Sequence, residues 1–499
     1  MVTFIVSLVT LLLGYMFYGR FVERVFAPDR RQTPSAVLRD DVDYIPMKTW
    51  KATMIQLLNI AGPGPIFGAL LGACFGPVVC LWIVLGCILG GAVHDYMSGM
   101  ISERSRGGTI VAVAGEYLGP FGQYAMRLVA IPLLLLAGAL FISMPAMLLA
   151  KVIPTISVKF WVWEIVIYYL LATLLPIDKI IGWLYPVFGV ALALMALFVG
   201  GALLLSPSFT LPELSLANMH PKGTPIWPFM FVTVACGAVS GFHSTQSPLM
   251  AKCMISERDG RKIFYGAMIL EGLIALIWAT AGHAFYGGTA GLTAALDKGG
   301  PASVVFEICK TLFGTSGAAL AILGVAICPI TSGDTSYRIL RLTLAEWLGI
   351  DQRKWLNRLL IAVPLLCVGA LLTQKDFVSL WRYIGWLNQV LAMVALWVAT
   401  AYLMRHEKYR YSSIITALPA TFMTAVTVTY LFMAPELGLK LPVNVSYPIG
   451  IMAALVLFMF YIAKAHKVEN TGPVPPLVPL PQRRPMAAPG ITQIPVAAR

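Results

Sequence analysis

The sequence predicts an all-α polytopic membrane protein whose core consists of two inverted groups of five helices. Composition is the first indication, because 58% of the 499 residues are hydrophobic and only 12% are charged, which excludes a soluble globular domain. Apolar runs of about eighteen or more residues recur along the whole chain, and each can cross a bilayer as a helix. Two of these runs are interrupted by glycine or proline at corresponding places, which indicates two related halves.

The apolar runs amount to about thirteen spans. An extra N-terminal span lies within residues 1–19, and two extra spans lie within 412–464. Between them, 49–205 forms a first repeat of five helices and 226–402 forms a second. Because five is an odd number, the second repeat crosses the membrane with the opposite topology. The expected spans are 2–19, 49–72, 77–101, 124–150, 159–176, 182–205, 226–250, 262–287, 316–342, 355–373, 379–402, 412–433 and 444–464.

The basic residues gather on one side of this topology. They follow the first, third, seventh, ninth and eleventh spans, as at Arg30, Arg104, Arg261 and Arg405, and the positive-inside rule assigns these loops to the cytoplasm. The N-terminus is then outside and the C-terminus cytoplasmic. The same rule accounts for the net charge of +13, so we expect membrane lipid and no nucleic acid as a partner. The Pro-rich tail at 470–499 is expected to be disordered.

The second span contains a cluster of helix-breaking residues at 58–68, which reads Leu-Asn-Ile-Ala-Gly-Pro-Gly-Pro-Ile-Phe-Gly. Pro63 and Pro65 each remove a backbone donor and clash with the preceding turn, and Gly62 and Gly64 have low helix propensity. Freed backbone groups are costly in hydrocarbon, so such a break persists only where it is buried in protein or lines a watery cavity. A simple proline kink is the alternative, and the clustering of glycines and prolines disfavours it.

The seventh span, which is the first of the second repeat, has its own break at 236–248. This stretch reads Cys-Gly-Ala-Val-Ser-Gly-Phe-His-Ser-Thr-Gln-Ser-Pro. Interrupted helices at matching positions of two inverted halves indicate the substrate site of a secondary transporter. The eight cysteines form no Cys-x-x-Cys pair and have no His cluster nearby, so we expect neither a metal nor a disulfide.

With these segments in view, the chain resembles the carbon starvation protein A family of bacterial inner-membrane transporters. The resemblance implies the amino-acid/polyamine/organocation superfamily and a LeuT-type five-plus-five inverted repeat. The activities of the family are uptake of pyruvate with protons and uptake of peptides. The matching stretches, in order along most of 49–402, are 59–68, 82–96, 240–248, 332–335 with Tyr337 and Arg338, and 386–389.

Pyruvate and peptides both carry a carboxylate, and we expect the broken helices to bind it. The half-helix after the first break starts near Pro65, so the free N–H groups of Ile66, Phe67 and Gly68 and the positive end of the helix dipole would face the cavity. Glycines there allow backbone and ligand to approach closely. The predicted substrate-binding residues are Gly62, Gly64, Ile66, Phe67 and Gly68 at the first break, and Ser240, His243, Ser244, Thr245 and Gln246 at the second.

Two alternatives stay open at the second break. The hydroxyls of Ser244 and Thr245 can bond to carbonyls of their own helix. His243 can be a core histidine with a structural partner, although a buried His without one is costly and a ligand could supply it here.

His94 and Asp95 lie well inside the third span. An intramembrane carboxylate is expensive and functional by default, and burial favours its neutral form, which suits proton carriage. The alternative is a structural hydrogen bond from Asp95 to the first broken helix, at Gln56 or Asn59.

The ninth span carries Thr331, Ser332 and Asp334. By its resemblance to LeuT-type transporters, this helix would form a sodium site with the first break, and hydroxyl oxygens suit that ion. Asp334 could carry a proton instead, or pair with Arg338 one helical turn further on. We therefore expect H⁺ or Na⁺ as the coupling ion and no other cofactor.

The sequence thus predicts a secondary active transporter that imports pyruvate or a related small carboxylate by proton symport and alternating access, in the response to carbon starvation. A peptide importer coupled to protons or sodium is the first alternative. An intramembrane enzyme is disfavoured because no nucleophile accompanies His94, Asp95 or His243 at a known spacing. A nutrient sensor is disfavoured because the sequence shows no cytoplasmic signalling domain. The absence of a Walker motif excludes ATP as the energy source. The oligomeric state stays open.

Overall fold

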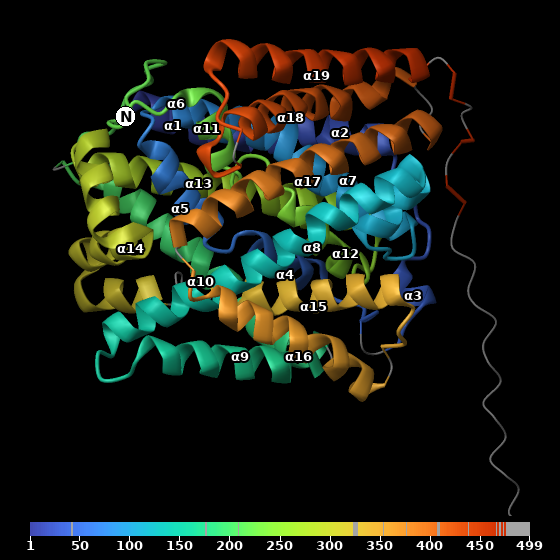
Figure 1. Cartoon of the computed structure of the whole chain (residues 1–499), viewed down its shortest axis with the longest axis horizontal. Helices are drawn as coiled ribbons and strands as arrows, with labels where there is room; N and C mark the ends of the chain where they lie inside the picture. The colour runs from blue at the N-terminus through green and yellow to red at the C-terminus, as the bar shows by residue number, and fades with distance from the viewer. Residues whose placement is uncertain are drawn as a thin grey trace, which may run out of the picture.

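The computed structural model describes residues 1–475 except 41–42, 175–176, 208, 323–327, 353, 376, 407–409, 438, 466, 469–470 and 473. In this part of the chain the fold is a bundle of helices without a β-strand. Most of the long helices run in one general direction, which is horizontal in Figure 1. Helices distant in sequence pack together, such as α9 with α16 and α10 with α13.

The helices follow one another with short connections. They are α1 (Val2–Leu13), α2 (Gly19–Phe26), α3 (Pro34–Val37), α4 (Thr49–Ile60), α5 (Gly64–Ala73), α6 (Val78–Leu81), the π-helical η2 (Trp82–Gly91), α7 (Ala92–Arg104), α8 (Ile110–Val152), α9 (Val158–Leu174), α10 (Ile177–Leu205), α11 (Ile226–Thr233), α12 (Phe242–Ala251), α13 (Gly266–Phe285), α14 (Thr289–Ile322), α15 (Cys328–Leu348), α16 (Trp355–Leu372), α17 (Phe377–His406), α18 (Ile414–Met433) and α19 (Val443–Ala465).

Nine helices of the described residues are long and apolar enough to cross a membrane, and the bent pair α4–α5 makes a tenth. The chain is therefore an all-α polytopic membrane protein, as predicted. The predicted spans 159–176 and 316–342 are helical where described, and 226–250 is helical except at its break; none of the three is among these ten. The total of thirteen spans and the five-plus-five repeat accordingly stay predictions, and most of the predicted tail, 476–499, lies outside the described residues.

The first predicted break is present. α4 ends at Ile60, α5 begins at Gly64, and the two helices meet at a bend of 47°. The second helix begins one residue before the predicted start, with Pro65 in its first turn, where the missing N–H costs no helical hydrogen bond. All residues from Ile60 to Gly68 are buried, so protein encloses the freed backbone groups.

The second predicted break lies between α11, which ends at Thr233, and α12, which begins at Phe242. The connection turns at Gly237, whose φ of 87° is in the region that favours glycine. Asn388 on α17 caps the new helix, since its Oδ1 accepts the N–H of Phe242 at 2.6 Å. The first N–H groups of a helix have no partner within it, so α17 fixes where α12 starts.

The two breaks touch each other. A Cβ built on Gly64 would collide with the Cβ and Sγ of Cys236, and one built on Gly68 would lie 3.1 Å from the carbonyl oxygen of Thr233. Glycine at these two positions therefore permits the close approach of α5 to the second break. Any larger residue at position 64 would push the two apart.

The chain before α4 is tied to the chain after α12. The N–H of Met47 donates to the carbonyl of Cys253 at 2.8 Å, and Met47 forms an isolated bridge with Met254. Thr49, the first residue of α4, donates through its hydroxyl to Oδ2 of Asp259 at 2.8 Å. These bonds connect the start of α4 to the chain that follows α12, so the two broken helices are joined at the ends remote from their breaks.

At the same end of the bundle, a buried ion pair joins the end of α7 to the segment that follows α12. Nε of Arg104, the last residue of α7, lies 2.6 Å from Oε1 of Glu257, and both side chains are nearly inaccessible. Arg104 also donates to the hydroxyl of Tyr402 at 2.8 Å, and its guanidinium lies 4.0 Å from the centre of the Phe26 ring. Four parts of the chain therefore meet at one guanidinium.

Candidate functional site

A small central cavity lies where the two breaks meet. Its volume is about 50 Å³, which is the space of one or two water molecules. α5 and its preceding turn, the second break, α8 and α17 supply the walls. The lining residues are Ile60, Gly62, Pro63, Gly64, Leu133, Ala137, Leu140, Phe141, Val232, Thr233, Ala235, Cys236, Phe242, Trp381, Ile384, Gly385 and Asn388.

Of the residues predicted at the first break, Gly62 and Gly64 line this cavity, while Ile66, Phe67 and Gly68 are buried behind it. The N–H of Phe67 was expected to be free, but it donates to the carbonyl of Pro63 at 2.8 Å. The helix starts one residue earlier than expected, so its first internal hydrogen bond is also one residue earlier. Because Pro65 has no N–H, the donors left in the first turn of α5 are those of Gly64 and Ile66.

At the second break, the predicted hydroxyl groups are engaged by protein. Ser244 donates to the carbonyl of Gly241 at 2.7 Å, and Thr245 donates to that of Phe242 at 2.6 Å. This is the local bonding that the sequence left open as an alternative. Ser240 contacts Asn388, and Gln246 donates to Thr245 at 3.1 Å.

The ionisable residues predicted separately on the third span and at the second break come together. Oδ1 of Asp95 lies 2.8 Å from Nδ1 of His94, and Oδ2 lies 2.9 Å from Nδ1 of His243. All three side chains are fully inaccessible. Gln56 instead donates to Ser247 at 3.3 Å, so the contact that Asp95 makes is with the second break rather than with Gln56. One carboxylate thus bridges two imidazoles in the interior of the bundle.

Glu271 on α13 extends this cluster, although no recognisable motif surrounds it in the sequence. Its Oε2 lies 3.4 Å from Nε2 of His243, and both groups are fully inaccessible. Cys236 completes the arrangement, since its Sγ lies within 4.8 Å of the ligand-type atoms of His243 and Glu271. Because Cys236 also lines the central cavity, its thiol lies between the cavity and the cluster. An intramembrane glutamate is itself a signal of function, and it was the only one available for Glu271.

The atoms of Cys236, His243 and Glu271 are close enough for one metal ion to contact all three. A thiolate, an imidazole and a carboxylate are ligand types that suit zinc. The bond from Asp95 to the other nitrogen of His243 is also the kind of support that metal-binding histidines receive. The same arrangement serves a shared proton equally well.

The predicted ion-binding residues of the ninth span lie on α15, close to the first break. The hydroxyl of Ser332 donates to the carbonyl of Leu58 at 3.3 Å, while that of Thr331 donates to Cys328 within its own helix at 2.8 Å. Oδ2 of Asp334 accepts a bond from the hydroxyl of Tyr185 at 2.8 Å. Of the three, Ser332 is the one that contacts the broken helix.

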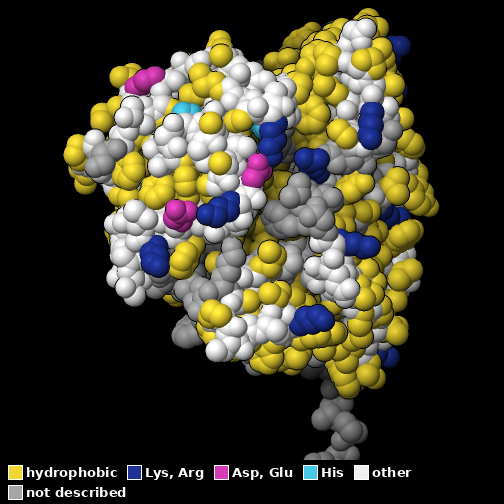
Figure 2. All heavy atoms as spheres, turned by 60° about the vertical axis from the view of Figure 1, so that its left-hand side comes forward, with side chains coloured by type: hydrophobic (Ala, Val, Ile, Leu, Met, Phe, Trp, Pro, Cys, Tyr) yellow, Lys and Arg dark blue, Asp and Glu magenta, His cyan; other side chains and the backbone are white. Residues whose placement is uncertain are grey.

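A larger hollow, which we call the vestibule, adjoins the central cavity on the side of the bundle where α14 and the chain N-terminus lie (Figure 1). Its volume is about 650 Å³, and Thr233 and Trp381 line both spaces. Figure 2 brings this side of the molecule forward, and basic and acidic side chains gather near the middle of the view. The exposed pair of Lys222 and Asp297 lines the vestibule, so the vestibule has a polar rim.

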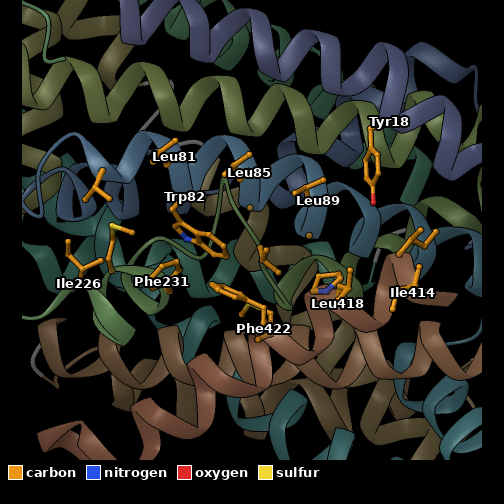
Figure 3. A pocket seen from close by; sticks show the side chains of 18 residues that line it. Tyr18, Leu81, Trp82, Leu85, Leu89, Ile226, Phe231, Ile414, Leu418 and Phe422 are labelled. Carbon is orange, nitrogen blue, oxygen red and sulfur yellow. The ribbon is translucent and has the colours of Figure 1, made fainter. Parts of the chain in front are cut away.

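A third hollow, shown in Figure 3, has a different chemistry. It has a volume of about 520 Å³ and lies between η2, α11 and α18, where Trp82, Phe231 and Phe422 project into it and Tyr18 closes one end. None of the described residues that line it is charged, and Leu85, Leu89 and Leu418 on its rim are exposed on the apolar outer surface. Such a groove offers nothing to hold a carboxylate.

The fold and site together define a polytopic helical membrane protein with two broken helices around a small cavity, next to a buried cluster of carboxylates and histidines. The chain belongs to the carbon starvation protein CstA family, which matches residues 1–159, 146–298 and 287–430. The resemblance noted in the sequence is thereby confirmed.

Three relatives show the range of similarity. An uncharacterized membrane protein of Haemophilus influenzae is 42% identical over 352 residues, which cover 60% of this chain and 95% of that one. The peptide transporter CstA of Bacillus subtilis is 25% identical over 92% of this chain and 94% of its own length. The pyruvate/proton symporter BtsT of Escherichia coli is 26% identical over 55% of this chain and 47% of its own length.

Proposed function

We propose that this chain is a secondary active transporter that imports pyruvate or a related small carboxylate together with protons. The observation that carries the proposal is the contact between Asp95 and His243. It joins a fully buried carboxylate on α7 to an imidazole in the second break. A proton gained or lost by this pair changes the charge directly behind the helix break that lines the central cavity. The hydrogen bond between Asp95 and His243 would therefore couple proton binding to the shape of the cavity.

The first break would supply the groups that bind the carboxylate of the substrate. The start of α5 leaves the N–H groups of Gly64 and Ile66 without a partner in the helix, and Gly64 lines the cavity next to the positive end of the helix dipole. A carboxylate is the ligand class that such a helix start favours. Since the cavity measures about 50 Å³, it must widen to admit the substrate, as alternating access requires.

Glu271 extends the proton site away from the cavity. With His94, Asp95 and His243 it forms a row of ionisable groups across α7, α12 and α13. Neighbouring groups of this kind share protons as a unit rather than one at a time. We therefore assign proton coupling to the row as a whole and not to a single residue.

The distribution of basic residues supports an orientation in a bacterial inner membrane with the N-terminus outside and the C-terminus in the cytoplasm. In this orientation the vestibule opens to the outside, and the Arg104–Glu257 pair lies at the cytoplasmic end. The substrate would then enter through the vestibule. The chain would act as a transporter without an enzymatic step.

A peptide importer is the second candidate, because the Bacillus subtilis relative that aligns with 92% of this chain is named a peptide transporter. A peptide carries the same carboxylate and would use the same helix start. Its greater length would need more room than the central cavity has, so the vestibule would hold the remainder.

Uptake of labelled pyruvate into proteoliposomes tests the proposal, with a proton gradient and a sodium gradient imposed separately and with di- and tripeptides as competitors. We expect accumulation that follows the proton gradient and is not reduced by peptides. Accumulation driven only by sodium would contradict proton coupling. If peptides are transported and pyruvate is not, the second candidate replaces the first.

A further inference from the structure

Glu103 lies one residue before Arg104 in the last turn of α7, and its side chain is fully buried. Among the residues that the structure describes, neither carboxyl oxygen of Glu103 has a hydrogen-bond partner. An ionised carboxylate in the protein interior is costly unless it is paired and hydrogen-bonded. Glu103 therefore needs either a cation beside it or a proton on its carboxyl group.

Two guanidinium groups lie near Glu103, but both are bound to other carboxylates. The charged residues that act most strongly on Glu103 are Glu257, Arg31, Arg104 and Asp29. Nε of Arg104 lies 2.6 Å from Oε1 of Glu257. Nη2 of Arg31 lies 2.8 Å from Oδ2 of Asp29, and its Nε lies 3.6 Å from Oε2 of Glu257. The two cations are thus taken up by Glu257 and Asp29.

The other elements at this end of α7 bring ionisable groups of their own, and each of these contacts a partner other than Glu103. They are Tyr402 and His406 on α17, Lys252 at the end of α12, Glu116 on α8, and Arg261 on η4 (Arg261–Tyr265), which pairs with Glu23 on α2. Around Glu103, two guanidinium groups balance two carboxylates, so an ionised Glu103 would leave one negative charge uncompensated in the described part of this cluster. The charges balance when Glu103 is protonated.

We propose that Glu103 is a proton-binding residue of the transport cycle, which holds a proton while Arg104 is bound to Glu257 and releases it to cytoplasmic water when this contact opens. The inference rests on the proposed function, because it takes protons as the coupling ion and this end of α7 as cytoplasmic. Asp95 lies on the same helix, eight residues earlier, which is about 12 Å along the helix axis. α7 thus runs from the buried cluster of carboxylates and histidines to the proposed release residue.

Opening of this contact and release of the proton are thermodynamically linked. When Arg104 leaves Glu257, the carboxyl group of Glu103 meets water and a freed guanidinium, and both favour its ionised form. The closed cluster then binds one proton more than the open one. A rise in cytoplasmic pH therefore favours opening, and a fall in cytoplasmic pH favours closure.

Infrared spectroscopy of the full chain in lipid vesicles tests the protonation without transport, because the C=O stretch of a protonated carboxyl group is separate from the bands of a carboxylate. At neutral pH, Glu103→Gln should lose the intensity of one carboxyl group from this band. Glu116→Gln is the matched control, since it removes an exposed acid of α8, and it should leave the band unchanged. A band that is the same in Glu103→Gln and in the wild type would overturn the inference.

The release step is tested by pyruvate uptake into proteoliposomes at several internal pH values. We expect the wild-type rate to fall as the internal pH is lowered, and Glu103→Gln to lose this dependence, because its amide keeps the cluster neutral at every pH. Glu103→Asp should restore the dependence. A Glu103→Gln protein with the wild-type dependence on internal pH would contradict the role in release. Failure of the proposed function is distinguishable, because it appears as absence of proton-driven pyruvate uptake by the wild-type protein.

Discussion

Oδ2 of Asp95 on α7 lies 2.9 Å from Nδ1 of His243 at the start of α12. The two residues are 148 positions apart in the sequence, one in each predicted repeat. Both side chains are fully inaccessible. A group that can gain and lose protons therefore joins the two halves of the chain behind their broken helices.

Replacing Asp95 by Asn should uncouple transport from the proton gradient. The amide has nearly the same shape but cannot ionise, so the site loses the charge that a proton would neutralise. We expect pyruvate accumulation under an imposed proton gradient to be lost, while exchange of labelled for unlabelled pyruvate persists. Glu164→Gln is the control, because it removes an exposed acid of α9 that is remote from the cluster. Normal gradient-driven accumulation in Asp95→Asn would contradict the assignment.

Replacing His243 by Gln should flatten the dependence of transport on pH. Glutamine can still donate a hydrogen bond to Asp95, so the packing of α12 is largely kept while a protonatable group is removed. The measurement is the KM for pyruvate at several external pH values. We expect the KM of the wild type to rise with pH and that of the variant to change little. A variant with the wild-type KM at every pH would exclude a role for His243 in coupling.

Zinc should inhibit the transporter rather than support it. Cys236, His243 and Glu271 offer three ligand-type atoms within 4.8 Å of one another, and Cys236 faces the central cavity. Protein treated with a chelator should therefore transport at the wild-type rate, and added Zn²⁺ should block it.

The Cys236→Ser variant should be less sensitive to Zn²⁺, since it lacks the thiolate. Cys367, an exposed cysteine outside the cluster, provides the control variant Cys367→Ser. If chelation abolishes transport and zinc restores it, a resident metal and not a shared proton occupies this site.

Loss of the Arg104 guanidinium should destabilise the fold. Its partner Glu257 is fully inaccessible. Removal of one member of a buried ion pair typically costs about 3–5 kcal/mol, and because Nε of Arg31 still lies 3.6 Å from Glu257, we expect the lower end of that range. Arg104→Gln should lower the free energy of unfolding in detergent by an amount of that order. Arg106→Gln, which changes an exposed residue two positions further on, should change it by less than about 0.5 kcal/mol. Equal effects of the two substitutions would show that the pair contributes nothing.

The fold class and the two breaks could be predicted because they depend on local chemistry. Hydropathy alone identifies membrane-crossing helices, and clustered Gly and Pro residues end a helix whatever surrounds them. The structure accordingly ends α4 at Ile60 and α11 at Thr233, within the predicted interrupted segments or just before them. The number of spans is harder to obtain, because α11 and α12 are each too short to be recognised as a span in isolation.

The site was predicted in parts but not as an arrangement. Asp95 and His243 stood out as polar residues in apolar segments, but their contact depends on how α7 packs against α12, which no local pattern encodes. No motif surrounds Glu271 in the sequence, yet its carboxylate lies 3.4 Å from Nε2 of His243. The expectation that the N–H of Phe67 is free was wrong, because α5 starts one residue earlier than predicted and this N–H is bonded to Pro63. The exact start of a helix depends on the folded backbone.

The bonds that tie Met47 to Cys253 and Thr49 to Asp259 give the two broken helices a common anchor. A tilt of α12 about its capped start at Asn388 would pull on the beginning of α4 through these bonds. The two broken helices would then move together as one unit. A disturbance of the proton cluster at α12 would therefore also displace α4.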